Sequence, residues 1–170
     1  MTPFRVSAKQ PNSRMCFICG LRNPFGLKAS FFQLENDELV ALFTAREEHQ
    51  GYPGRLHGGI ATALLDETIG RSIMGRYKED FWGVTMEVST KFRKPVPIGI
   101  QLRVVGRITR DEGRRFEGTG EILLPDGEVA VTGEGKYMKL PLSRIVGFDI
   151  QAQEWRVVDS AGDPREISLG

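Results

Sequence analysis

The chain of 170 residues has the length of one ordinary domain, and its content of 40% hydrophobic and 26% charged residues is close to the globular average. Its 23 Lys and Arg against 22 Asp and Glu give a formal net charge of +1, without the basic excess typical of nucleic-acid binding. No segment approaches the roughly 18 consecutive apolar residues of a membrane span, and residues 1–10 lack the apolar core of a signal peptide. We therefore expect a cytoplasmic protein that binds no nucleic acid and does not span a membrane.

The first half of the chain predicts an arm, a hairpin and a long helix. Residues 1–14 are polar and aperiodic, which predicts a loose N-terminal arm. Residues 27–34 and 39–45 are apolar-rich runs around a short polar loop, as in an antiparallel hairpin. Residues 56–76 follow with apolar side chains at spacings of three and four, the period of a helix.

The second half predicts four strands separated by turns. The expected strands are residues 84–92, 102–108, 116–124 and 128–140. An order of two strands, one helix and four strands excludes a parallel βαβ sheet and predicts an α+β fold, an antiparallel sheet packed on one helix. Residues 141–170 are mixed in character and form a C-terminal extension that the pattern leaves unassigned.

The helix carries a carboxylate among small side chains. On a helical wheel one face holds Gly59, Thr62, Ala63, Asp66 and Gly70, so another part of the molecule must approach this face closely. Asp66 is either a reactive carboxylate or an ordinary solvated one, and the pattern alone gives these alternatives about even weight.

The start of this helix is a candidate oxyanion site. Gly58 and Gly59 leave the first backbone N–H groups open, and the helix dipole favours negative charge there. The alternative is a tight turn into the helix. Asp66 lies seven residues beyond Gly59, about 10 Å along the axis, so both groups cannot contact one carbonyl from the same helix. A shared reaction therefore requires a second subunit.

A family resemblance rests on Leu56-His57-Gly58-Gly59 followed by Asp66, within this order of elements. The segment closely resembles the hotdog-fold acyl-CoA thioesterases of the phenylacetate-pathway and human acyl-CoA thioesterase type. The resemblance covers residues 15–140 and includes the cysteine-containing stretch 16–27 and Gln50-Gly51-Tyr52-Pro53-Gly54. It implies a hotdog fold, in which a curved antiparallel sheet wraps a long central helix.

The resemblance also implies catalytic roles. Asp66 would act as general base or nucleophile on the thioester, and the Gly58 N–H of the other subunit would bind the oxyanion. Thr85 would orient the water, although a strand Thr is equally ordinary at this position. His57 would line the thioester pocket, and its alternative role is to cap the turn before the helix.

Four further residues are candidates for substrate binding. Gln50 and Gly59 lie on either side of the His-Gly motif. Some relatives carry an Asn or Gln six residues before the His, and this chain has Gly51 at that position. Arg93 and Lys94 are candidates for the phosphates of coenzyme A, with a solvated strand end as the alternative.

Two cysteines and two glycines have simpler interpretations. A structural zinc needs four ligands, and His49 and His57 are not spaced to complete a site with Cys16 and Cys19. A thioredoxin-like motif would need a βαβ unit, so we expect reduced thiols in a turn and no metal.

Gly118 and Gly120, on one face of a strand, indicate close packing of the backbone.

The resemblance implies an acyl-CoA thioesterase of one hotdog domain, a homodimer or dimer of dimers, that takes an acyl-CoA substrate and needs no cofactor. The alternatives are a hotdog hydratase or dehydratase and a non-catalytic acyl-CoA-binding protein. A DNA-binding sensor is disfavoured because about fourteen polar residues before Met15 leave no room for a helix-turn-helix. Acyl length and the higher oligomer stay open.

Overall fold

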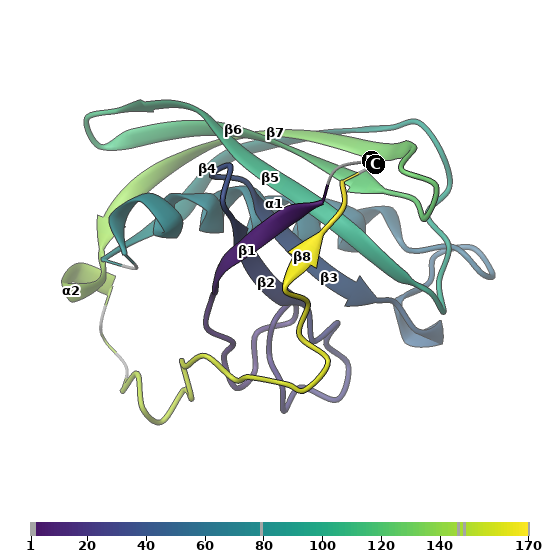
Figure 1. The fold of residues 1–170 in the computed structure, drawn as a ribbon, viewed down its shortest axis with the longest axis horizontal. Coiled ribbons are helices and arrows are strands. Elements are labelled where there is room, and N and C mark those ends of the chain that lie inside the picture. Colours follow the sequence, from purple (N-terminus) through teal and green to yellow (C-terminus); the bar gives the residue numbers. More distant parts are fainter. Residues whose placement is uncertain (1–2, 79, 146, 148, 170) are drawn as a thin grey trace.

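The computed structural model describes residues 3–78, 80–145, 147 and 149–169 as an eight-stranded antiparallel sheet with a long helix against it (Figure 1). The elements in chain order are β1 (Phe4–Lys9), β2 (Ser30–Leu34), β3 (Leu39–Thr44), the 3₁₀ turn η1 (Glu47–His49), α1 (Gly58–Tyr77), β4 (Phe81–Phe92), β5 (Gln101–Glu112), β6 (Arg115–Leu123), β7 (Val129–Pro141), α2 (Leu142–Ile145) and β8 (Glu166–Ile167). The strands lie in the order β4-β7-β6-β5-β3-β2-β1-β8, which puts β4 at one edge. The α+β class and the hotdog arrangement predicted from the sequence are confirmed.

Helix α1 is central because its buried side chains occupy more than one face. The largest of them pack against the concave side of the sheet: Leu64, Leu65, Ile69, Ile73 and Met74. The helix begins at Gly58, where the His57 ring accepts a hydrogen bond from the Gly59 N–H. It ends at Lys78, whose backbone is left-handed with φ 48°. The predicted helix over residues 56–76 is therefore confirmed to within two residues.

Glycines in the sheet let α1 approach closely. A Cβ at Gly118 would lie 2.6 Å from Ile69 Cγ2, and one at Gly120 would lie 3.0 Å from Ile69 Cγ1. Both distances are too short for a side chain, so the expectation of close packing at these two glycines is confirmed.

The predicted strands are present with adjusted bounds. The hairpin is β2 and β3, paired from Ser30 with Leu42 to Gln33 with Leu39. Strand β4 begins at Phe81 rather than at residue 84, and residues 101–112 form one continuous strand. These shifts lengthen individual strands, and the structure adds β1 and β8 to the two strands and four strands that the pattern predicted.

The expectation of a loose arm over residues 1–14 is wrong, apart from residues 1 and 2, which lie outside the described part. Strand β1 pairs with β2 on one side and with β8 on the other. Beyond it, Asn12 is buried, and its amide donates to the carbonyl oxygens of Cys19 and Ala29, at 2.8 and 2.9 Å. Strand pairing and these side-chain hydrogen bonds therefore hold the segment to the rest of the chain.

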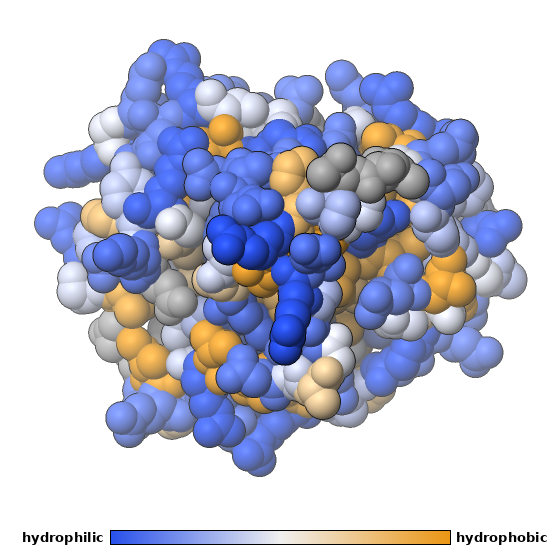
Figure 2. Space-filling view, in the orientation of Figure 1, coloured by the Kyte–Doolittle hydropathy of each residue, from blue (hydrophilic) through white to orange (hydrophobic). Residues whose placement is uncertain are grey.

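The C-terminal extension also packs on the domain. After α2 the chain crosses the lower part of the view in Figure 1 and returns as β8 beside β1. The face seen in this orientation is mostly hydrophilic, with hydrophobic side chains in smaller groups between (Figure 2). Among the described helices none has the length and apolar character needed to cross a membrane.

Candidate active site

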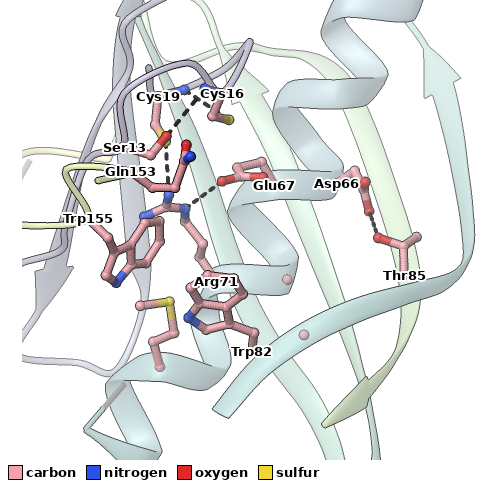
Figure 3. Close-up of a pocket in the computed structure, with 13 residues that line it drawn as sticks. Ser13, Cys16, Cys19, Asp66, Glu67, Arg71, Trp82, Thr85, Gln153 and Trp155 are labelled. Atoms are coloured by element: carbon pink, nitrogen blue, oxygen red, sulfur yellow. Dashed lines mark hydrogen bonds and ion pairs between the residues drawn. The ribbon is translucent and has the colours of Figure 1, made fainter. Parts of the chain in front are cut away.

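The carboxylate of Asp66 is held by two hydroxyl groups. Asp66 lies half-buried in the middle of α1, and its Oδ1 accepts hydrogen bonds from Thr85 Oγ1 at 2.8 Å and from Tyr137 Oη at 3.1 Å. Figure 3 shows the Thr85 side chain pointing from β4 to the carboxylate. Within the described residues, no protein group donates to Oδ2, so this oxygen remains open to a substrate or water.

The surroundings alter the acidity of this carboxyl. Burial raises the pKa of Asp66, the hydrogen bonds from Thr85 and Tyr137 lower it, and the neighbouring charge of Glu67 raises it again. The net pKa is above that of an ordinary Asp. A carboxylate with a raised pKa is a stronger base once ionised, which suits proton abstraction near neutral pH.

Tyr137 was not among the residues predicted from the sequence. It is fully buried in β7, stacked on Phe116 with ring centroids 4.9 Å apart. A Cβ at Gly135 would lie 2.4 Å from its ring, and one at Gly70 would lie 3.1 Å from it. The sequence does place Gly135 two residues before Tyr137, and a buried Tyr needs a hydrogen-bond partner for its hydroxyl. This pattern does not identify Asp66 as the partner.

The close approach expected at the small-residue face of α1 is confirmed at Gly70. Besides the Tyr137 ring, β4 passes so near that a Cβ at Gly83 would lie 2.6 Å from the Gly70 carbonyl oxygen. The small residues thus let Asp66 reach both β4 and β7.

The start of α1 holds the His-Gly-Gly segment in a capped turn. The Nδ1 atom of His57 accepts from the Gly59 N–H at 2.9 Å, while His57 O accepts from the N–H groups of Ile60 and Ala61. Within the part of the chain that the structure describes, the Gly58 N–H has no acceptor. Of the two glycine amides, Gly58 is therefore the one that is free to bind a ligand.

The sequence-predicted residues fall into separate groups. The structure brings Thr85 to Asp66 but leaves the start of α1 about 10 Å away along the helix axis, by the rise of seven residues. Gln50 Oε1 accepts from the Gly54 N–H and holds the turn before α1. Arg93 and Lys94 are exposed just after β4, and the Lys94 ammonium pairs with Glu128.

A cavity of about 480 Å³ opens beside Asp66. One wall is the face of α1 that carries Asp66, Glu67, Gly70, Arg71 and Met74, and β4 supplies Trp82, Gly83 and Thr85. The remaining lining comes from Ser13, Cys16, Cys19, Gln153 and Trp155, in segments that the sequence analysis left outside the site or unassigned. Figure 3 shows Asp66 and Thr85 on one side of α1, and Trp155 and the cysteines on the other.

A buried cation organises the far side of this cavity. The Arg71 guanidinium donates to Glu67 at 2.7 Å, to the Pro11 carbonyl at 2.8 Å and to Cys19 Sγ at 3.1 Å. A hydrogen bond from Cys16 lowers the pKa of Cys19, burial opposes the effect, and Arg71 lowers the pKa further. The guanidinium therefore stabilises a Cys19 thiolate, whereas the pKa of Cys16 is raised.

The two cysteines have one further potential metal ligand near them. The Sγ atoms of Cys16 and Cys19 and a carboxylate oxygen of Glu67 lie within 4.8 Å of one another. From the sequence, only the two histidines were considered as further ligands, and Glu67 was not anticipated. However, Arg71 already bonds to both Glu67 and Cys19, so it supplies the positive charge that balances these ligands.

Comparison with known proteins agrees with this architecture. The family model of the thioesterase superfamily matches residues 53–131, which include the start of α1, Asp66 and Thr85. The acyl-coenzyme A thioesterase THEM4 of Bos taurus is 26% identical over 118 residues, 68% of this chain and 47% of that protein. The chain spans about half the length of the curated relatives it matches.

Two solved structures add to the comparison. Protein RHA08564, described as a thioesterase superfamily protein, superposes with a TM-score of 0.64 at 27% identity, over 71% of this chain and 58% of that one. BH2602 of Bacillus halodurans, solved with CoA, gives a TM-score of 0.54 at 25% identity, over 59% of this chain and 66% of that one. Matching motif, order of elements and three-dimensional structure agree: residues 53–131 match the thioesterase superfamily, and the chain has the hotdog fold.

Proposed function

We propose that the protein hydrolyses an acyl-CoA thioester to the free acid and CoA, with Asp66 as the catalytic residue. The observation that carries the proposal is the half-buried Asp66 carboxylate, held by two hydroxyl groups through one oxygen and open at the other, beside a cavity. The likeness to THEM4, named as an acyl-coenzyme A thioesterase, and to BH2602, solved with CoA, supports this substrate class.

Asp66 acts as a general base in this proposal. Oδ2 accepts a proton from water as the water oxygen attacks the thioester carbonyl, the C–S bond breaks, and CoA leaves as its thiolate and takes up a proton. Thr85 and Tyr137 are positioning residues, since both hold Oδ1 and so orient Oδ2. We favour this route over direct attack by Asp66 because a carboxylate is a weak nucleophile and a positioned water needs only proton removal.

The oxyanion is stabilised by the Gly58 N–H of a second subunit. This amide has no acceptor among the described residues and lies at the positive end of the helix dipole. Its distance from Asp66 of the same helix requires that a partner supply it. His57 and Gly59 contribute through the capped turn that fixes the direction of this N–H.

Strand β4 provides the surface for this dimer. It is a 12-residue edge strand whose outer edge pairs with no strand of the described sheet, and it exposes Val84, Met86 and Phe92. A long exposed edge of this kind is a template for pairing with another chain. Antiparallel pairing of two β4 strands would bury Thr85 and close the site, in a homodimer or a dimer of dimers.

Coenzyme A would reach this interface with its phosphates near Arg93 and Lys94. Both side chains are exposed just after β4. Gly58 lies near the end of that strand, since a Cβ on Gly58 would be 3.4 Å from Phe92 Cζ. Gln50 is proposed to act by holding the adjacent turn. Because CoA thioesters are intracellular metabolites, the proposal includes a cytoplasmic location.

The function is tested by incubating the purified protein with butanoyl-, decanoyl-, phenylacetyl- and 2-butenoyl-CoA and measuring free thiol and hydration of the double bond. We expect thiol release from at least one saturated or aryl ester. Hydration of 2-butenoyl-CoA with the thioester intact would indicate a hydratase. Binding of the esters without turnover would indicate an acyl-CoA-binding protein.

Tyr137→Phe is expected to shift the acid limb of the kcat/KM profile to higher pH. The Tyr137 hydrogen bond lowers the pKa of Asp66, so its removal leaves the carboxyl protonated at pH values where the wild-type carboxyl is ionised. Activity on the alkaline plateau should stay within a few-fold of wild type. Tyr77→Phe is the matched control, because Tyr77 donates to the distant Asp111, and an equal shift in both variants would contradict the assignment.

A further inference from the structure

The cavity beside Asp66 is completed by the C-terminal segment. Gln153 and Trp155 line the same space as Asp66 and Thr85, although they lie beyond the last long strand, in the extension from residue 141. In Figure 3 Asp66 and Thr85 lie on one side of α1 and Trp155 on the other, and the lining of the cavity between them includes Gly70 and Gly83. An acyl group whose carbonyl lies at Asp66 and whose chain enters this cavity would therefore extend toward Trp155.

The indole of Trp155 is fixed by two neighbours. Its ring packs against Trp82 of β4 with centroids 4.9 Å apart at an angle of 53°. The Arg71 guanidinium lies 4.8 Å from the centroid of the same ring, a cation–π contact of a buried charge. Because Arg71 is held in turn by Glu67, Pro11 and Cys19, the indole rests on a side chain that cannot easily move.

The backbone around Trp155 is joined to the N-terminal part of the chain. Asn12 and Arg156 exchange backbone hydrogen bonds of 2.9 and 3.1 Å, and the Arg14 N–H donates to the Gln153 carbonyl at 2.8 Å. Glu154 pairs with Arg22 at 2.7 Å. The residues on both sides of Trp155 are thus anchored, so the indole forms part of a wall.

We propose that Trp155 is a specificity-determining residue, the end wall of the acyl pocket, and that it restricts the enzyme to compact acyl groups. This inference rests on the proposed thioesterase function. An alkyl chain long enough to pass the indole would have to displace it and lie against the Arg71–Glu67 pair. Apolar atoms placed there would take water away from buried charges without offering hydrogen bonds, which is unfavourable.

The inference is tested with butanoyl- and decanoyl-CoA and with their thioether analogues, S-butyl-CoA and S-decyl-CoA, which cannot be hydrolysed. Wild type is expected to prefer the short chain both in kcat/KM and in calorimetric binding. Trp155→Ala should raise two ratios by at least about 10-fold: kcat/KM for decanoyl-CoA over butanoyl-CoA, and the association constant of S-decyl-CoA over that of S-butyl-CoA. A single methylene in a pocket is worth about that factor.

Three variants control for effects on folding. Trp155→Phe keeps an aromatic wall and should retain the wild-type ratio. Trp155→Leu keeps an apolar contact with Trp82 but shortens the wall, and replaces the Ala variant if that variant does not fold. Val157→Ala changes an exposed residue of the same segment and should leave the ratio unchanged.

The outcomes separate this inference from the function on which it rests. A wild-type protein that prefers the long chain, or a ratio unchanged in both Trp155→Ala and Trp155→Leu, would overturn the end wall while leaving hydrolysis in place. If no ester is hydrolysed but the S-alkyl analogues show the expected change in Trp155→Ala, the catalytic proposal fails and the wall is supported.

Discussion

Asp66→Asn is expected to lower kcat for acyl-CoA hydrolysis by at least about 100-fold, the lower range of general-base contributions. The amide oxygen can still accept hydrogen bonds from Thr85 and Tyr137, so the geometry is kept while the base is removed. The measurement is steady-state thiol release with the best ester. Asp159→Asn, at an exposed residue, is the matched control and should retain full activity.

Thermal unfolding separates this loss from a loss of folding. Burial raises the folded-state pKa of Asp66, so the carboxyl favours the folded state at low pH, and this contribution is lost as the pH rises through the folded pKa. Asp66→Asn should therefore unfold at or above the wild-type temperature at pH 8, and the difference should close as the pH falls. A variant that keeps more than a tenth of wild-type kcat would show that Asp66 is not the base.

Mixing two inactive variants is expected to restore activity if the site is shared between subunits. Gly58→Pro removes the N–H at the first position of α1, where proline is tolerated, and a Cβ at Gly58 meets Phe92 only at ordinary contact distance. Loss of one oxyanion donor should cost about 100-fold or more in kcat. Each heterodimer with Asp66→Asn then holds one intact site and one doubly altered site.

Random exchange of subunits makes half of the dimers heterodimers, so an equal mixture should recover roughly a quarter of wild-type activity. Each variant mixed with itself is the control. If subunit exchange is verified and no activity returns, Asp66 and Gly58 belong to the same chain's site or do not act together. A monomeric wild type with full activity would contradict the dimer directly.

The sequence predicted those features that local patterns determine. The spacing of apolar residues, at period two or period 3.6, predicted the hairpin, α1 and the four later strands. Gly118 and Gly120 predicted close packing that the structure confirms. Thr85 was chosen through the family resemblance, and its hydroxyl does contact Asp66.

Features that depend on distant contacts were missed. Strand β1 has only six residues, in which apolar and polar side chains alternate, and it pairs with β2 and with β8, the latter from the other end of the chain. Tyr137 lies 71 residues after Asp66, and Arg71 contacts Cys19 52 residues before it. Period and spacing cannot pair such residues, because only the folded sheet brings them together.

The most direct test of the account is one turnover in ¹⁸O water with enzyme in excess over the best acyl-CoA. Mass spectrometry then measures the label in the released acid and in the peptide that contains Asp66. We expect one ¹⁸O atom in the acid and none in Asp66, since the carboxylate activates water without bonding to the acyl group. Label in the Asp66 carboxylate would show direct attack through an anhydride, and the absence of labelled acid together with an unlabelled Asp66 would contradict hydrolysis itself.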